Sequence, residues 1–192
     1  MSVMSENEAL LRRIESDETL ADLLVWPGDF DIGRREPVED VFLASGMSLT
    51  PVAGDDAGGT YFLCGGADGP VLYGDSEGNG ALMAADLTQA VTLIAALPYW
   101  RDLGHGWSIE EGEESLGEDH PELPEYRAEL LVLLAGLGIV PPSNERLVER
   151  FRTAARRTVP DFQLQCRHDD AHGVYVSTYD PLFKDFAALG SR

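Results

Sequence analysis

The chain has 192 residues, 44% of them hydrophobic, and its 34 Asp and Glu residues against 14 Lys and Arg give a formal net charge of −20. This length is typical of one domain with a sizeable core, and no run of about 18 apolar residues predicts a transmembrane helix. The negative charge argues against binding to nucleic acid or anionic membranes, because both need Lys and Arg to displace counterions, and it suits either solubility or attraction to a basic protein.

The N-terminal segment predicts two short helices, or one kinked helix, that end before Trp26. Ser5 followed by Glu8 has the spacing of a capping box. The first residues lack the basic-then-apolar pattern of a signal peptide, so we expect a cytoplasmic location. A third short helix is predicted over 37–44, because Pro37 suits a first helical turn and is followed by carboxylates that favour the positive helix end.

The central stretch, residues 49–100, predicts three short strands and one helix. The strands are expected at 49–53, 60–64 and 70–73, with Gly- and Asp-rich turns between them. The helix is expected to begin after Asp86, which has Gln89 three residues on. A meander of strands followed by a covering helix predicts an α+β fold, a mostly antiparallel sheet with helices packed on one face.

Residues 108–125 hold eight carboxylates and no Lys or Arg. Such a block is typical of a mobile loop or a solvated face, and the functional alternative is an acidic docking surface. We expect an acidic loop at 117–125 that separates a main domain, 1–116, from a C-terminal part, 126–192.

The C-terminal part is expected to contain a helical hairpin and a β-hairpin. An apolar helix should run from Pro124 to Gly138 and be well buried, because its apolar arc is wide. Ser143 or the residue after it should cap an arginine-rich helix whose role the sequence leaves open, and the two helices should form an αα-hairpin. The β-hairpin is expected to follow, with its turn at 168–173.

Two segments of the central stretch, LTPVAGDDAGGTYFLCGG at 49–66 and GPVLYGDSEG at 69–78, resemble the SUKH superfamily when taken with the helix after Asp86. This superfamily groups immunity proteins of bacterial toxin systems with a yeast regulator of cell-wall synthesis. The matching residues are Pro51, Val52, Ala53, Asp56, Gly59, Tyr61, Gly69, Pro70, Val71, Tyr73, Asp75 and Glu77. The resemblance implies a non-enzymatic binding fold, with Asp75 and Glu77 facing a partner groove.

We therefore predict a cytoplasmic, acidic protein-binding domain, most simply an immunity-type protein that neutralises a toxin. A basic nuclease is one plausible target, because it must carry positive charge to hold nucleic acid. Partly exposed Trp and Arg side chains often anchor protein interfaces. We therefore expect Trp100, Arg101 and Trp107, which follow the central helix, to border the partner surface. The predicted partner-binding residues are Tyr73, Asp75, Glu77, Trp100, Arg101 and Trp107. We expect a monomer or a weak dimer.

Two other functions stay open. The first is a small hydrolase that uses Ser76, whose sequence GDSEG has the letters of a nucleophile elbow, or the acidic turns. An elbow requires a strand, a sharp turn and then a helix, and the sequence offers no helix directly after this turn. The second is a regulatory adaptor with no toxin partner.

No cofactor and no metal are predicted. The cluster from His168 to His172 contains two histidines and two aspartates, but His-x-x-x-His converges mainly on a helix, and a turn is expected here. The acidic turns around Asp55 and Asp75 are interpreted as ordinary turn chemistry. Cys64 and Cys166 are expected to be buried free thiols.

Overall fold

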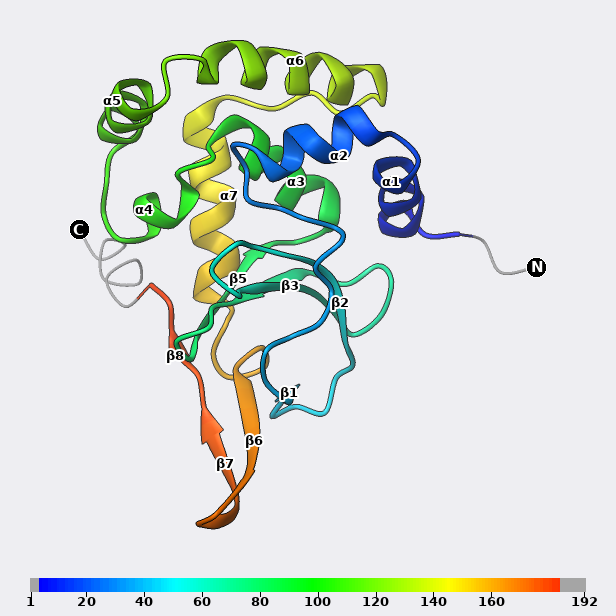
Figure 1. The fold of residues 1–192 in the computed structure, drawn as a ribbon, viewed down its shortest axis with the longest axis vertical. Coiled ribbons are helices and arrows are strands. Elements are labelled where there is room, and N and C mark those ends of the chain that lie inside the picture. Colours follow the sequence, from blue (N-terminus) through cyan, green and yellow to red (C-terminus); the bar gives the residue numbers. More distant parts are fainter. Residues whose placement is uncertain (1–3, 184–192) are drawn as a thin grey trace.

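The computed structural model describes residues 4–183, and these residues form an α+β fold (Figure 1). The helices are α1 Glu6–Glu15, α2 Glu18–Val25, α3 Leu87–Ala96, α4 Trp100–Gly104, α5 Ile109–Asp119, α6 Leu123–Gly136 and α7 Asn144–Arg156. The strands are β1 Val41–Leu43, β2 Leu49–Gly54, β3 Thr60–Cys64, β4 Val71–Gly74, β5 Asn79–Ala84, β6 Leu164–Asp170, β7 Gly173–Thr178 and β8 Asp180–Pro181. No helix in this range combines the length and the apolar character needed to cross a bilayer.

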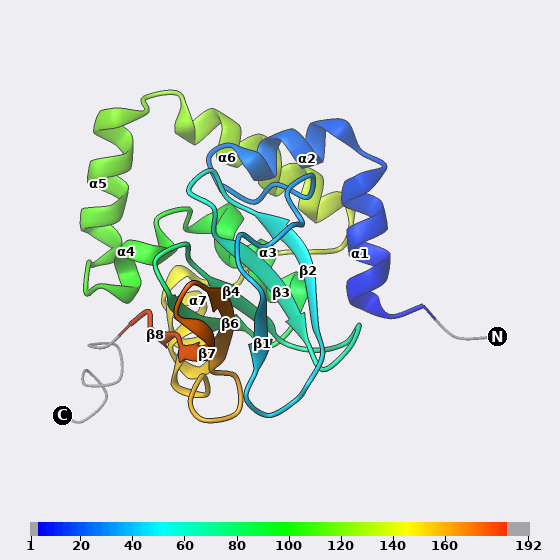
Figure 2. The same ribbon diagram turned by 60° about the horizontal axis from the view of Figure 1, so that its bottom comes forward.

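Two sheets form the centre and the base of the molecule. The larger has the strand order β2-β3-β4-β5-β8, in which β2 to β5 form an antiparallel meander and β8 joins β5 in parallel. The smaller has the order β1-β6-β7 and is antiparallel. Helices gather on one side of the larger sheet, and the β6–β7 hairpin projects from the opposite end of the molecule (Figures 1 and 2).

The larger sheet is buried on both faces. Alternate residues of a strand point to opposite faces, so Tyr61 and Leu63 belong to the core cluster shared with the helices. Phe62 and Cys64, between and beside them, pack instead with Leu164 of the smaller sheet. This double burial explains why β3 reads as a continuous apolar run rather than an alternating one.

The central helix α3 is held at its start by two polar side chains. Asp86 caps it by accepting a hydrogen bond from the Gln89 N–H, which confirms the predicted cap and helix start. The buried Asn7 of α1 accepts from the Leu87 N–H at 2.9 Å and donates to the Gly69 carbonyl oxygen at 3.3 Å. Asn7 therefore joins α1, α3 and the β3–β4 turn through groups that would otherwise be buried without partners.

One prediction for the first half of the chain is wrong, and one strand was not predicted. Residues 37–44 form no helix: the segment enters β1, whose residues pair with β6, with Val41 opposite Cys166. Eight residues gain few helical hydrogen bonds, and the β6 partner lies more than 120 positions later, so local signals could not reveal it. The sequence also missed β5, which pairs with β4 from Gly80 to Ala84.

The acidic block is helical rather than a loop. Ser108 and Glu111 form a complete capping box for α5, and residues 117–125 are divided between the end of α5, a short connection and the start of α6. The acidic block therefore begins with a capping box, Ser108 and Glu111, which predicts a helix start; the prediction of a loop relied on the charge of the block alone.

The C-terminal helices do not form the expected αα-hairpin. Helix α6 packs on α2 and α3, whereas α7 packs mainly along β5. The expectation that α6 is well buried is also wrong, because Val132 on its outer side is 70% exposed. Helix α7 covers β5 of the larger sheet instead. Just after this helix, Thr158 Oγ1 accepts a hydrogen bond from the Leu82 N–H of β5 at 2.9 Å.

The β-hairpin is present with a shorter turn than expected. Asp170 pairs with Gly173, so the connection consists of Ala171 and His172. His168 is therefore a strand residue opposite Tyr175 and not part of the turn. Both Cys64 and Cys166 are buried and free, as predicted.

Candidate functional site

A network of buried polar side chains lies where the ends of β2, β3 and β4 meet α4. Arg101, the second residue of α4, donates from Nη2 to Asp55 Oδ2 at 2.9 Å and to Tyr61 Oη at 3.0 Å. Tyr73 Oη donates to the same Asp55 oxygen at 2.5 Å. The Arg101 guanidinium also lies 4.7 Å from the Trp100 ring centroid and 4.8 Å from that of Tyr73. Arg101 Nη1 also lies 3.9 Å from Asp29 Oδ2. The network thus combines a close ion pair, a longer one and two cation–π contacts.

Both oxygens of the buried Asp55 carboxylate accept hydrogen bonds. Its side chain is 1% exposed, and its second oxygen, Oδ1, accepts the Gly59 N–H at 2.7 Å. A Cβ at Gly59 would lie 2.4 Å from Tyr73 Oη and 2.5 Å from Asp55 Oδ2, so the GDDAGG turn needs glycine there for space. Asp55 therefore stabilises its own turn, as interpreted from the sequence, and is also the anionic partner in a buried ion pair with Arg101.

The two tyrosines of the network are permanent donors. Burial raises the pKa of Tyr61 and of Tyr73 far above the usual range for a phenol. Both hydroxyls therefore stay protonated at any physiological pH. Tyr61 Oη donates a hydrogen bond to the Asp29 carbonyl oxygen at 3.1 Å. With every group engaged, the network fits a structural role better than acid–base catalysis.

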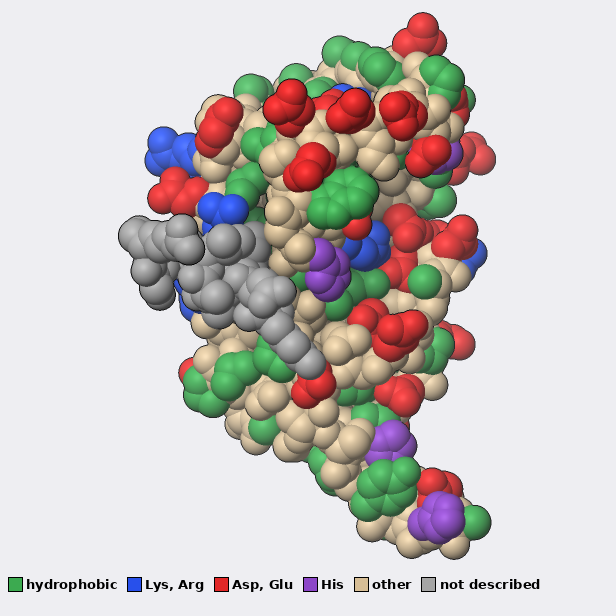
Figure 3. Space-filling view, turned by 90° about the vertical axis from the view of Figure 1, so that its left-hand side faces the viewer, with side chains coloured by type: hydrophobic (Ala, Val, Ile, Leu, Met, Phe, Trp, Pro, Cys, Tyr) green, Lys and Arg blue, Asp and Glu red, His purple; other side chains and the backbone are tan. Residues whose placement is uncertain are grey.

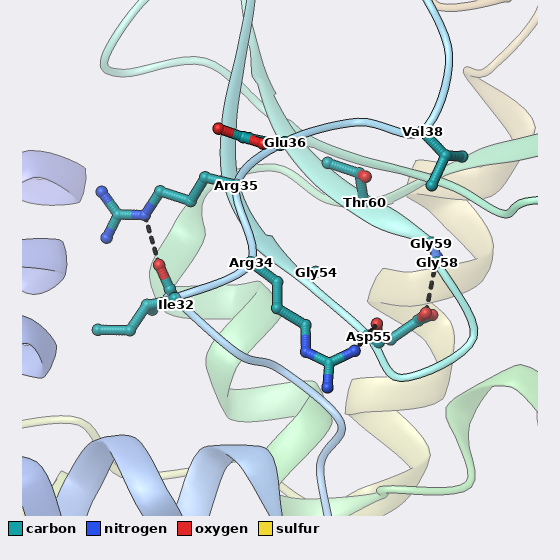
Figure 4. A pocket seen from close by; sticks show the side chains of 11 residues that line it. Ile32, Arg34, Arg35, Glu36, Val38, Gly54, Asp55, Gly58, Gly59 and Thr60 are labelled. Atoms are coloured by element: carbon teal, nitrogen blue, oxygen red, sulfur yellow. Dashed lines mark hydrogen bonds between the residues drawn. The ribbon is translucent and has the colours of Figure 1, made fainter.

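A hollow of about 580 Å³ opens beside this network (Figure 4). Arg34 lies in its wall and is engaged three times: with the Asp55 carbonyl oxygen at 3.2 Å, with Asp31 at 3.2 Å and with Asp56 at 2.6 Å. Arg35, on the other side, pairs with Glu15 at 2.7 Å. Both cations already have carboxylate partners, so the hollow offers no unpaired arginine to an anionic ligand.

The predicted partner-binding residues fall into two groups. Tyr73 and Trp100 are buried, and the expectation that Trp100 is partly exposed is wrong, because its indole is 0% exposed and contacts Phe151 and Phe183 edge-on. Arg101 keeps 27% of its side chain exposed. Trp107 is 41% exposed.

Asp75 and Glu77 form part of the β4–β5 turn. Asp75 Oδ1 accepts the N–H groups of Glu77 and Asn79 at 2.9 and 2.8 Å, which is the local hydrogen bonding of an Asx turn. Strand register aligns Gly54, Thr60 and Gly74 across the sheet. The β4–β5 turn therefore lies at the same end of the strands as the Asp55 turn.

Helix α5 presents an acidic outer face. Its exposed carboxylates belong to Glu110, Glu111, Glu114, Glu118 and Asp119. Within residues 4–183 none of these five has a cationic side chain within 4.0 Å. Figure 3 shows acidic side chains gathered over this upper part of the molecule.

The inner face of α5 is fixed to the body of the protein. Glu113 accepts two hydrogen bonds from Arg127 at 2.6 and 2.7 Å and one from Tyr99 Oη at 2.8 Å. These donors lower the pKa of Glu113, the Arg127 hydrogen bonds being the largest cause. Gly112 lies against the Tyr99 ring, so closely that a Cβ would be 2.2 Å from it. Helix α5 is therefore a docked element and not a charged loop.

A partly exposed tryptophan lies at each end of α5. Trp107 directly precedes its N-cap, and Trp26, 40% exposed, contacts the ring of the C-cap residue His120 edge-on with centroids 4.5 Å apart. Neither Trp26 nor His120 is among the partner-binding residues predicted from the sequence. Their contact joins positions 94 residues apart, and no local pattern indicates it.

Ser76 lies on the exposed β4–β5 turn. The turn joins two strands, whereas a nucleophile elbow joins a strand to a helix. Among the described residues no hydrogen bond joins Ser76 to a histidine. The geometry that would activate this serine is therefore missing from the described part of the chain.

No protein-family model, curated protein or solved structure matches this chain significantly.

Proposed function

We propose that this protein is a non-enzymatic binding domain whose acidic α5 face receives a basic protein partner. The observation that carries the proposal is the group of five exposed carboxylates without a cationic partner among residues 4–183, on a helix flanked by two partly exposed tryptophans, Trp107 and Trp26. Tryptophan is enriched among residues that dominate binding energy, and unpaired charges give electrostatic steering.

The carboxylates and the tryptophans are expected to affect different steps of binding. The net charge of −20 and the α5 carboxylates accelerate encounter with a basic surface, and salt weakens this effect. Burial of an indole slows dissociation. Because α5 is docked through Glu113 and Gly112, its face is presented in one orientation and loses little conformational entropy on binding.

The resemblance to the SUKH superfamily supplies the class of partner. On this basis the partner is a toxin, and the domain is an immunity-type protein that occupies its active surface in the cytoplasm. A basic nuclease has the charge that the α5 face requires. The Asp75–Glu77 turn remains part of the proposed surface through the resemblance.

The proposal is tested by capture of partners from the source cell's lysate at low and at about physiological salt, followed by binding kinetics with the captured protein. The variant Glu110→Gln/Glu114→Gln/Glu118→Gln removes three charges from α5. A second triple variant, Glu6→Gln/Glu18→Gln/Asp22→Asn, removes three exposed charges from α1 and α2 and is the matched control.

We expect the α5 variant to lower the association rate about tenfold or more at low salt and the control to have a much smaller effect. Trp107→Ala should raise the dissociation rate while the association rate stays nearly constant. Equal effects of the two triple variants would reject the α5 face as the binding surface. Esterase turnover that Ser76→Ala abolishes would favour the hydrolase alternative, and a captured partner without toxic activity would favour the adaptor.

A further inference from the structure

A second group of chemically competent side chains lies on the smaller sheet, away from α5. Glu39, Cys166 and His168 each offer one ligand atom, and the three atoms all lie within 4.8 Å of one another. The Cys166 Sγ and His168 Nδ1 atoms are 4.0 Å apart. This group is separate from the α5 face, whereas Glu39 lines the same small cavity as Asp75 of the β4–β5 turn.

Strand pairing brings these three residues together. Cys166 and His168 are two positions apart on β6, so their side chains share a face. Val41 is opposite Cys166, and the Arg167 N–H continues the pairing by donating to the Asp40 carbonyl oxygen. The same register places Glu39 across from His168, on that same face. The backbone therefore fixes the convergence, and it is not an accident of flexible surface side chains.

His168 and Glu39 each make a further hydrogen bond to a neighbouring side chain. His168 Nε2 contacts Ser177 Oγ at 2.7 Å, which leaves Nδ1 turned toward the thiol, and the ring stacks on Tyr175 with centroids 4.6 Å apart. The Glu39 carboxylate accepts from Tyr179 Oη. Partners of this kind orient the ligands in metal sites and fix the histidine tautomer.

The donor set fits one metal class. A thiolate, an imidazole and a carboxylate are the three ligand types of Zn²⁺, and tetrahedral geometry with ordinary Zn–S and Zn–N lengths separates sulfur from nitrogen by about 3.5 Å. The observed 4.0 Å needs only a small closure. One thiolate and one carboxylate also balance the ion's charge of +2, so binding leaves no net charge beside the buried core.

We propose that Cys166 Sγ, His168 Nδ1 and a Glu39 carboxylate oxygen bind one Zn²⁺ ion, with the fourth position open to water. The ion ties the segment before β1 to β6 and so stabilises the smaller sheet. His172, which the sequence groups with His168, belongs to the hairpin turn and takes no part. Three protein ligands and an open position are the arrangement of zinc sites that exchange their fourth ligand.

The experiment uses the full chain, treated with a chelator and then titrated with Zn²⁺ alone by calorimetry and with Co²⁺ alone by visible absorption. We expect one ion per chain and an absorption band from cobalt–thiolate bonding. Cys166→Ser should remove the band, and Cys64→Ser, which changes the other buried thiol, should keep it. His168→Gln should weaken Zn²⁺ binding at least about tenfold, whereas the matched His172→Gln should not.

Thermal unfolding controls for misfolding. Zn²⁺ should raise the unfolding temperature of the wild type and of His172→Gln but not of His168→Gln, because only binding to the folded state stabilises it. Should Cys166→Ser fail to fold, Glu39→Gln and Ser177→Ala decide the matter, with Ser177→Ala expected to weaken binding about 10- to 100-fold. No thiolate band in the wild type, or equal losses in His168→Gln and His172→Gln, would overturn the site.

Discussion

Two groups of carboxylates in this protein carry the same charge and are held in opposite ways. Asp55 is buried, and its oxygens are occupied by Arg101, Tyr73 and the Gly59 N–H. The outer carboxylates of α5 are exposed and have no cationic partner among the described residues. The net charge of −20 therefore combines two kinds of carboxylate: a buried, paired one that specifies the fold, and solvated ones that remain available to a partner.

The largest effect should come from breaking the buried pair. Asp55→Asn keeps the shape of the side chain but removes the nearer counter-charge of the Arg101 guanidinium, leaving only Asp29 Oδ2 at 3.9 Å. Breaking a buried ion pair typically costs about 3–5 kcal/mol. We expect a loss of about 3 kcal/mol in the free energy of unfolding measured with urea. The control is Asp56→Asn, whose side chain is 84% exposed and which should change stability little. Equal stability of Asp55→Asn and wild type would show that the network is dispensable.

Steric substitution on α5 should have the next largest effect and tests whether this helix is docked. A Cβ at Gly112 would lie 2.2 Å from the Tyr99 ring, so Gly112→Ala must displace a side chain that is bonded to Glu113. We expect a loss of about 2 kcal/mol in the free energy of unfolding. At Gly117, on the same helix, a Cβ meets no atom within 4 Å.

Gly117→Ala is therefore the matched control and should stabilise the protein by about 0.5–1 kcal/mol, because alanine favours the helix. If both alanine variants were stabilising, the inner face of α5 would not be packed as described.

Removing one hydroxyl from the network should have a smaller effect than removing its charge. Tyr73→Phe deletes the donor to Asp55 Oδ2 but leaves Arg101 and Gly59 in place. A hydrogen bond to a charged group contributes about 1.5–3 kcal/mol, and we expect the lower end of this range in urea unfolding. Tyr175→Phe, at an exposed tyrosine whose hydroxyl contacts Asp170, is the control and should be nearly neutral. A Tyr73→Phe cost as large as that of Asp55→Asn would mean that the phenol, not the ion pair, holds the network.

Features that depend on neighbours in sequence were predictable. The Asp86 cap, the strands near 49–54 and 60–64, and the cap at Ser143 each follow from side chains within a few positions of one another. The α+β class followed from their order. The two buried thiols could likewise be recognised from the apolar residues that flank Cys64 and Cys166.

Features that depend on distant partners were not predictable. Trp100 is buried because Phe151 and Phe183 close over it from segments far along the chain. Arg101 was predicted to be a partly exposed anchor and keeps 27% of its side chain exposed, but the aspartate that binds it lies 46 positions away in sequence. The segment 37–44 became a strand for the same reason, since its pairing partner β6 lies near the C-terminus. Tertiary contacts overrode local propensity in each case.

The smallest expected effect is a change in pH dependence at the point where α5 is fixed. Arg127 lowers the pKa of Glu113 below that of an unfolded glutamate. Between the folded and unfolded pKa values the unfolded chain binds more protons, so stability rises with pH in this window and is lost as pH falls through the folded value. Glu113→Gln should therefore flatten the dependence of unfolding free energy on pH below about 4.5, relative to the wild type.

The neighbouring Glu114→Gln is the matched control, because that carboxylate is exposed and lies on the outer face of the same helix. It should leave the pH dependence of the wild type nearly intact. Urea unfolding at several pH values between about 3 and 6 makes the comparison. If both variants flattened the curve equally, the acidic helix would act as a diffuse field, and the distinction between its paired inner face and its solvated outer face would not hold.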